Sequence, residues 1–480
     1  MWRMRDLSFE GKALIIRSLA ISKINAALEM TTIDAAIIKQ INDYIFEFLW
    51  SGKNIRIGKE ICYLPKDMGG LNIVNITALV KAKRVQWIIR ALKDDKGETW
   101  SRLIENYLRC LDNDFDIEFF ALKVTDSSYL THSKNIPRFY KECIDYFEEL
   151  LRISAKNTSS IIWCNDKYRF NGIPLFFKHW SKSGYKVLSD LYSTEGEFLQ
   201  NEIYNNLTRK SGFFFEMSQI KKSYPAYLVT QNRVTEREEL LNGSRECLLQ
   251  QFFSLPNSES KSLSELSSKD LYSIFLNHNA PDIKTKSYWS QQFEVNEIDW
   301  KVWIAVNLTN KLIPQKTRDF NWKVLHRLVN SGAKLKLMNL SDGVCKRCPS
   351  QDIENLEHLL YSCAESKKIW SFAEKIVQNF LGKNKPIGKM QALSGVWQSG
   401  LSVDSVILNM VYSITRHHIW KIRCKGWYGG DKTNSELSVC FLKNILIDHI
   451  HLLIFSKSTN KQYLSKLMIM ELAIEKLDTN

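Results

Sequence analysis

Four side chains that bind transition metals lie close together in the C-terminal half of this sequence. Cys345 and Cys348 are separated by two residues, and His358 and Cys363 by four, which gives the pattern C-x2-C-x9-H-x4-C. Three thiolates and one imidazole complete a tetrahedral zinc shell and leave no open position for a catalytic water. The pattern therefore predicts a structural zinc knuckle, with two thiolates on a tight turn and the other pair near a helix end. Its binding energy, about 10–16 kcal/mol in finger-sized peptides, would stabilise the local fold.

A catalytic zinc site is the sharper alternative for these residues. A zinc deaminase needs a histidine-x-glutamate triplet ahead of a proline-cysteine-x-x-cysteine motif. Val344 precedes the first cysteine here and no such triplet occurs, so this class is excluded. Buried free cysteines remain the other alternative, because thiols are common in protein interiors.

No other motif supplies catalytic groups. A polymerase palm needs paired aspartates on a strand hairpin to hold metal ions. The one such pair, Asp94-Asp95, follows a helical pattern and is flanked by Lys93 and Lys96, which indicates a helix end. The sequence has no Walker loop and no G-x-S-x-G elbow. We therefore expect no catalytic residues and no small-molecule substrate.

The residues that precede and enter the knuckle are strongly basic. From Lys301 to Cys348 there are ten basic and two acidic residues, a net charge of +8, interleaved with aromatic residues such as Trp303 and Trp322. Basic side chains neutralise phosphates, and aromatic faces can stack on unpaired bases. We favour core positions for the tryptophans and nucleic-acid contact for the cations on the knuckle. The candidate contacts are Lys316, Arg318, Lys323, Arg327, Lys334, Lys336, Lys346 and Arg347.

Composition supports a polyanionic partner. The 480 residues include 66 Lys and Arg against 52 Asp and Glu, a net charge of +14, which favours nucleic acid first and an anionic membrane second. No apolar run in the sequence reaches the roughly 18–20 residues that span a bilayer, so we expect no membrane partner. Ten cysteines without a disulfide-like framework indicate a reducing, intracellular compartment.

The elements that must position these residues are mainly α-helical. Apolar residues recur at helical spacing from Ala13 to Leu28, from Ile37 to Leu49 after a start at Thr31–Asp34, and from Ile76 to Ile88 after the cap residue Asn75. We expect these stripes to be core. Further helices are expected near 364–381 and 406–421.

The chain is long enough for several domains. We expect a helical region at 1–108, a connecting region of undefined fold at 109–265, a zinc-binding domain at 266–395 and a C-terminal helical region at 396–480. The serine-rich segment Ser254–Ser268 is the best candidate for a linker.

Two separated blocks resemble the C-terminal part of the reverse transcriptases of LINE-type (non-LTR) retrotransposons. The first contains Leu7–Lys12, Phe48–Trp50, Leu64–Lys66 and Gly69–Leu71, and is similar to the family's helical thumb. The second runs from Tyr288-Trp289 through Trp300, Phe320, Trp322 and His326 to the knuckle and Trp370, and is similar to the zinc-binding domain of these polymerases.

The resemblance implies a part in target-primed reverse transcription. The thumb would grip the template–primer duplex, and the zinc-binding domain would help to bind the element's RNA. Candidate duplex contacts in the thumb-like region at 1–108 are Lys53, Arg56, Lys59, Lys66, Lys81, Lys83, Arg84 and Arg90, although an ordinary solvated helix face explains them equally well. Location in the nucleus and cytoplasm follows only from the family.

The palm with its catalytic aspartates has no counterpart in this sequence, so we expect a non-catalytic fragment that binds RNA and RNA–DNA or DNA duplex. Two alternatives stay open. One is a zinc-stabilised scaffold for a protein partner, on which Trp370, Phe372, Ile376 and Phe380 would present a helix face. The other is a decayed copy of an element.

Overall fold

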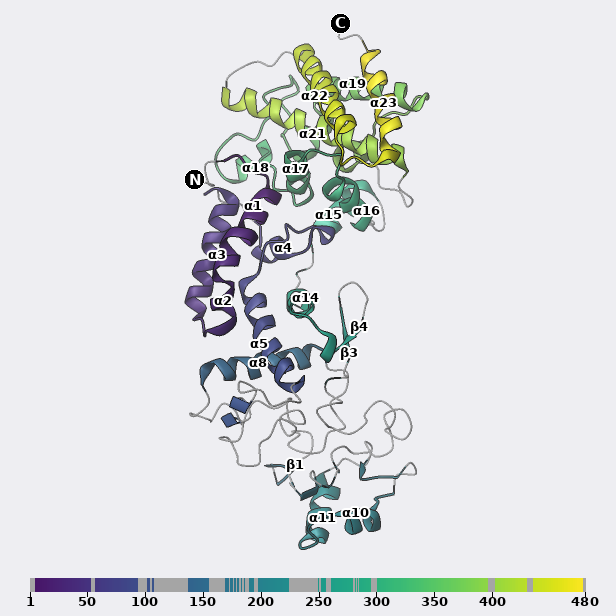
Figure 1. The fold of residues 1–480 in the computed structure, drawn as a ribbon. Helices are drawn as coiled ribbons and strands as arrows, with labels where there is room; N and C mark the ends of the chain where they lie inside the picture. The colour runs from purple at the N-terminus through teal and green to yellow at the C-terminus, as the bar shows by residue number, and fades with distance from the viewer. Residues whose placement is uncertain are drawn as a thin grey trace. The chain divides into compact units, whose positions relative to one another are not determined.

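The chain folds into helices with very little sheet, as the computed structural model shows (Figure 1). The described residues exclude 1–4, 53–56, 94–101, 108–136, 155–168, 224–248, 295–299, 396–401, 430–434 and 478–480, together with shorter gaps between 104 and 284. Within the described residues the strands form two short antiparallel pairs, β1 (Arg169–Phe170) with β2 (Ile173–Pro174) and β3 (Phe252–Ser254) with β4 (Ser260–Ser262). The expected mainly α fold is confirmed.

The helices follow the chain in this order. Before residue 280 they are α1 (Phe9–Ile15), η2 (Ile16–Ile21), α2 (Ser22–Met30), α3 (Ala35–Trp50), α4 (Lys59–Tyr63), η3 (Lys66–Met68), α5 (Ile76–Lys93), α8 (Arg138–Ser154), α10 (Gln200–Asn206), α11 (Phe213–Ser223), η6 (Leu263–Glu265) and α14 (Ser268–His278). After it they are α15 (Thr285–Phe293), α16 (Trp300–Ile304), η7 (Ala305–Thr309), α17 (Gln315–Leu325), α18 (Gly332–Leu337), η8 (His358–Ser362), α19 (Ala364–Leu381), α20 (Lys389–Ser394), α21 (Val403–Gly429), α22 (Ser435–Phe455) and α23 (Lys461–Glu475).

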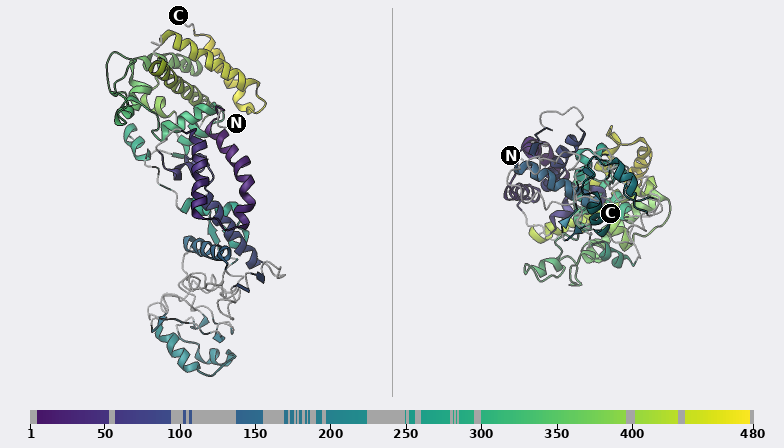
Figure 2. Two further views of the ribbon diagram at one scale, coloured as in Figure 1. Left: turned by 90° about the vertical axis from the view of Figure 1, so that its left-hand side faces the viewer. Right: turned by 90° about the horizontal axis from the view of Figure 1, so that it is seen from below.

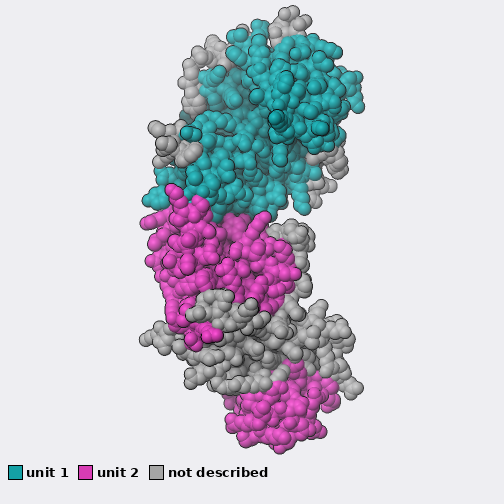
Figure 3. Space-filling view, in the orientation of Figure 1, with its two compact units in different colours: residues 1–20, 43–74, 280–480 teal, residues 21–42, 75–279 magenta. Residues whose placement is uncertain are grey.

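These elements belong to two compact units that are discontinuous in sequence (Figure 3). Unit 1 contains residues 1–20, 43–74 and 280–480, and unit 2 contains residues 21–42 and 75–279. The N-terminal motifs therefore share a unit with the cysteine cluster. The four sequential regions expected above remain a prediction, and the units cut across the first of them.

The long helix α21 organises the C-terminal part of unit 1. It packs against α17, α19, α22 and α23, which are labelled near it in Figure 1, and Figure 2 shows the same ribbon from two other directions. Its side chains are buried along most of its length because neighbours cover several sides. The expectation that α19 presents a partner-binding face is also wrong, because neighbouring helices cover that face. Its four residues lie in the core: Trp370, Phe372, Ile376 and Phe380.

Helix α22 differs from what the sequence indicated. Residues Glu436–Phe455 have a mean hydropathy of 1.6 and are long and apolar enough to cross a membrane by length and composition alone, so the expectation of no such run is wrong. Only 22% of this apolar segment is buried, so it is not a fully covered core helix. In α22 Leu442, Leu446 and Ile450 are fully buried against the neighbouring helices, whereas Leu452 and Phe455 are exposed.

Unit 2 has its main core where α5 packs against α8 and α14. The Oδ1 of Asn75 accepts a hydrogen bond from the backbone N–H of Ala78 at 3.2 Å, which confirms the expected cap of α5. The expected linker is wrong: residues 254–268 include β4 and η6, and Leu263 and Leu266 are buried in this core.

The three apolar stripes were only partly core. In α3, Ile45 and Leu49 are buried, but Ile37 is 47% exposed and Tyr44 is 70% exposed. The stripe before it is interrupted by the π-helix η2, which rotates the following residues, and Leu19 lies exposed. Helix α5 follows the expected pattern most closely, because α2, α8 and α14 all pack against it.

Candidate metal centre

The first cysteine pair is held by a short antiparallel bridge. Val344 pairs with Ile353, the N–H of Cys345 donates to the carbonyl of Asp352 at 2.9 Å, and that of Glu354 donates to the carbonyl of Gly343 at 2.9 Å. Gly343 has a φ of 86°, a conformation that side chains disfavour. The loop therefore turns back sharply and directs Cys345 and Cys348 inward.

The second ligand pair lies on a π-turn. The Oδ1 of Asn355 accepts the N–H of His358 at 2.7 Å and starts the turn. The N–H of Cys363 donates to the carbonyl of His358 at 2.9 Å, five residues back, which closes η8 directly before α19. Single π-turns of this kind are frequent at functional sites. Here the wider turn brings both ligands to the same side, and their place at a helix end agrees with the sequence prediction.

The four donor atoms converge on one buried position. They lie within 4.8 Å of one another; the Sγ atoms of Cys345 and Cys363 are 3.9 Å apart, and the Sγ of Cys348 is 3.4 Å from Nε2 of His358. A tetrahedral shell with metal–sulfur bonds of about 2.3 Å has sulfur–sulfur edges of about 3.8 Å. The two shortest separations are close to such edges, and the widest exceeds them by about 1 Å, so the donor set fits a tetrahedral metal ion after small side-chain shifts.

Neighbouring polar groups support the ligands. Oδ2 of Asp352 lies 3.8 Å from Nδ1 of His358, on the side of the ring opposite the sulfurs, an arrangement that orients metal-binding imidazoles. Contact with the thiol of Cys345 lowers the pKa of Cys363 to about 7, while the same contact raises that of Cys345. One thiolate is thereby stabilised beside its partner.

The knuckle is anchored to α21 by charged groups. Glu354 forms a buried ion pair with Arg423, whose Nη2 lies 2.7 Å from Oε1, and the ammonium of Lys346 lies 4.8 Å from the ring centre of Trp427. Arg347 instead donates to the carbonyl of Leu359 at 2.9 Å, inside the knuckle. The metal centre thus depends on residues more than 50 positions further along the chain.

Comparison with known proteins agrees with this geometry. Residues 267–370 match the family described as zinc-binding in reverse transcriptase. A curated relative from Xenopus laevis, the transposon TX1 uncharacterized 149 kDa protein, is 22% identical over 409 residues, which cover 78% of this chain and 30% of the relative. The chain thus spans less than a third of that protein's length.

These two findings confirm the resemblance that the motifs indicated, to the C-terminal, reverse-transcriptase-associated region of a non-LTR retrotransposon protein. The matched segment includes all four metal ligands. Arg423 and Trp427 of α21, which contact the knuckle, lie beyond the matched segment.

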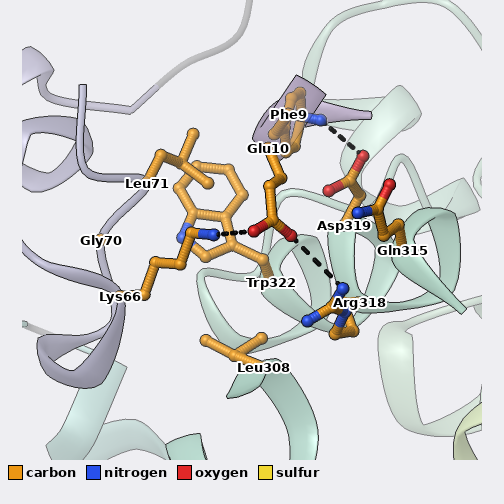
Figure 4. A pocket seen from close by; sticks show the side chains of 10 residues that line it. All are labelled: Phe9, Glu10, Lys66, Gly70, Leu71, Leu308, Gln315, Arg318, Asp319 and Trp322. Atoms are coloured by element: carbon orange, nitrogen blue, oxygen red, sulfur yellow. Dashed lines mark hydrogen bonds and ion pairs between the residues drawn. The ribbon is translucent and has the colours of Figure 1, made fainter. Parts of the chain in front are cut away.

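The N-terminal motifs dock on the zinc-binding domain in a small pocket of unit 1 (Figure 4). Glu10 lies between Lys66 and Arg318, at 2.5 and 3.3 Å, and these cations lower its pKa, Lys66 most strongly. The N–H of Phe9 donates to Oδ2 of Asp319 at 2.8 Å, and burial raises the pKa of Asp319 to about 6. Glu10 and Asp319 thus form polar contacts that join the two motif blocks.

The backbone carbonyl of Gly69 provides a second connection between the two motif blocks. The Nε1–H of Trp322 donates to the carbonyl of Gly69 at 2.9 Å, and Nε2 of His326 lies 2.8 Å from the same oxygen. Burial lowers the pKa of His326 to about 4, so the ring is neutral at pH 7 and donates from Nε2. Residues that carry the resemblance in sequence are therefore contact partners in the fold.

The predicted nucleic-acid contacts occupy different environments. Trp300, Trp303, Phe320 and Trp322 are core residues, as favoured above. Lys53 and Arg56 lie outside the described residues, as does the Asp94-Asp95 pair. The exposed candidates are Lys59, Arg90, Lys316, Arg327, Lys336 and Lys346; the half-buried ones are Lys66, Lys81, Arg318, Lys323, Lys334 and Arg347; the buried ones are Lys83 and Arg84.

Several of these cations form hydrogen bonds or ion pairs within the folded chain. Arg84 is fully buried and donates to the carbonyls of Leu28 and Glu29, each at 2.9 Å, and to that of Thr31. It is a packing residue rather than a phosphate contact, because its guanidinium does not reach the surface. Ion pairs engage others: Lys59 with Asp43, Lys81 with Glu149, Lys83 with Glu29, and Lys316 with Asp6.

Sequence reasoning missed Glu354 and Arg423, which are 69 positions apart. No local pattern marks such a pair, because each residue alone is an ordinary charged side chain on a loop or a helix.

Proposed function

We propose that this chain is a non-catalytic, nucleic-acid-binding part of a LINE-type retrotransposon reverse transcriptase. Within the full protein it would bind the element's RNA and the template–primer duplex during target-primed reverse transcription, in the cytoplasm and nucleus. The observation that supports this best is the buried Cys345–Cys348–His358–Cys363 cluster inside a reverse-transcriptase zinc-binding domain.

The metal in this proposal is zinc. Three thiolates and one imidazole are a donor set that zinc prefers, and a shell of four protein ligands leaves no position for substrate or water. The ion would therefore hold the knuckle together, and the protein side chains around it would contact the ligand. Catalysis of DNA synthesis would belong to a different part of the parent protein.

Exposed cations are present on the knuckle and in the helical segment before it. Lys346 lies on the knuckle, and Arg327 follows α17 with its guanidinium 3.7 Å from the ring centre of Tyr288. Such groups neutralise phosphates and release counterions, so binding falls steeply as salt is raised.

The test measures the affinity of the zinc-loaded chain for a primed RNA–DNA duplex and for structured RNA across a salt series. The Cys345→Ser/Cys348→Ser variant removes two ligands, and Cys440→Ser serves as a control at a cysteine outside the cluster. We expect sub-micromolar binding with a steep salt slope, weakened at least tenfold (~1.4 kcal/mol) in the double variant alone. Absence of binding at low salt, by protein shown to be folded and zinc-loaded, would overturn the proposal.

A protein-binding scaffold is the second candidate, and α22 supports it. Leu437 and Phe441 are 59% and 58% exposed, one helical turn apart, and Leu452 and Phe455 continue the exposed apolar side. An apolar interface of this kind has no counterion release, so its binding would change little with salt. The salt series therefore separates the two candidates. A decayed element copy would show neither activity.

A further inference from the structure

Two lysines of α21 lie outside the basic stretch that the sequence singled out. Lys421 and Lys425 are both exposed and are four residues apart, so the helical rise separates them by about 6 Å along one side. In the described part of the chain, Lys421 forms no ion pair with a carboxylate, and Lys425 lies 5.9 Å from the ring centre of Phe441.

Helix α17 lies directly beside this part of α21. Oγ1 of Thr317 and Nδ1 of His417 are 2.9 Å apart, and the ring of Phe320 stacks on those of His417 and Trp420, with centroids 5.0 and 5.9 Å apart. Because Thr317 follows Lys316, and His417 is one turn before Lys421, the packing places lysines of both helices on the same side of unit 1.

The charges of these lysines act on one another. Burial, followed by the charges of Lys316 and Lys425, lowers the pKa of Lys421. The charges of Lys421, Lys323 and Lys316 all contribute to the low pKa of His417, of which burial is the main cause. We call Lys316, Lys323, Lys421 and Lys425 the α17–α21 lysine face, of which Lys316 also pairs with the exposed carboxylate of Asp6. Like charges held this close oppose folding, and a bound polyanion removes that cost.

We propose that the α17–α21 lysine face binds the phosphate backbone of a nucleic-acid duplex without reading its bases. The inference rests on the proposed function and names the surface that carries it. Lysines act as point charges toward phosphates, and Phe320 and Trp322 are buried and closed to bases. Contacts to phosphate alone carry no sequence information.

The test uses the full zinc-loaded chain and a labelled RNA–DNA hybrid of about 20 base pairs, between about 50 and 200 mM salt. Lys421→Gln/Lys425→Gln removes two charges, and Lys457→Gln/Lys461→Gln removes two from exposed sites elsewhere in unit 1. We expect about tenfold weaker binding and a salt slope smaller by about two in the first variant, with binding by the second close to that of the unmodified chain. Lys421→Arg/Lys425→Arg should retain binding, because it keeps both charges.

Three outcomes would overturn the inference. If the unmodified chain binds with a steep salt slope and both glutamine variants bind equally well, the lysine face is not the contact surface, although the proposed function stands. An arginine variant as weak as the glutamine variant, at unchanged metal content and melting temperature, would exclude a role through charge. Binding to phosphatidylserine vesicles without binding to the hybrid would assign the face to a membrane and overturn the proposed function as well.

Discussion

Glu354 and Arg423 show at the residue scale how the metal centre is supported. Their side chains are 0% and 1% exposed, and Oε1 of Glu354 accepts three hydrogen bonds: from Nε and Nη2 of Arg423 and from the N–H of Gly332, at 3.0, 2.7 and 2.8 Å. The guanidinium also lies 4.1 Å from the ring centre of Trp427. A buried pair of this kind adds little net stability over apolar residues, but the loss of one partner is costly.

Replacement of Glu354 by glutamine should therefore destabilise unit 1. The change leaves the charge of Arg423 buried and uncompensated, and we expect the free energy of unfolding to fall by about 3 kcal/mol. Urea unfolding followed by circular dichroism measures it. Asp43→Asn is the control, because it breaks an ion pair whose side chains are 45% and 52% exposed and should cost less than about 1 kcal/mol. Equal losses in the two variants would show that burial does not give the Glu354 pair its importance.

At the element scale, the turn after η3 determines how the N-terminal motifs dock. Gly69 has a φ of 88° and presents its carbonyl to Trp322 and His326 of α17 and its C-terminal end. At Gly70 the chain passes so close to the preceding turn that an added Cβ would lie 1.9 Å from the carbonyl oxygen of Leu64. Glycine is thus required at both positions of the motif, at Gly69 by the backbone conformation and at Gly70 by the lack of space for a side chain.

Gly70→Ala should consequently unfold or displace this turn, with a loss of more than about 3 kcal/mol in the free energy of unfolding. Gly382→Ala is the contrasting control: its φ of 66° is unfavourable for alanine, but no atom lies within 4 Å of the added Cβ, whereas Gly70 is limited by space. We expect a loss of about 1 kcal/mol there. Thermal unfolding of both variants measures the difference, and a Gly70 variant as stable as the control would mean that the backbone relaxes freely.

At the scale of the whole molecule, the cysteine cluster belongs to unit 1, and the cores of unit 2 consist of other residues. Unit 2 has one core between α5, α8 and α14 and a second, smaller one around Trp180 and Phe213. Neither includes a metal ligand. Metal binding and folding are therefore expected to be coupled in unit 1 only.

Chelation of the metal should raise amide hydrogen exchange selectively. We expect faster exchange in α18, η8 and the start of α19, which enclose the ligands, and unchanged exchange in α5, α8 and α14. Mass spectrometry of the protein with and without chelator measures this, and return of zinc should restore the original rates. Faster exchange throughout the chain would contradict the assignment of the metal to one unit.

The sequence by itself determined the features that depend on neighbouring residues. The C-x2-C-x9-H-x4-C spacing predicted which four side chains converge on the candidate metal site, Asn75 was recognised as a cap, and the expected limits of α19 agree with those observed. These features rest on turns, helix ends and short loops, whose geometry follows from local backbone chemistry.

Only the tertiary structure decided which side chains are covered. Arg84 and Lys421 are both cations on long helices, yet α2 and α8 bury the first, and the second remains at the surface. The same holds for Tyr44, which is exposed in an apolar stripe, and for Glu354, which is buried against Arg423 of α21, 69 residues further on. Burial depends on contacts between distant segments, and a helical period records which residues share a face but not what packs against that face.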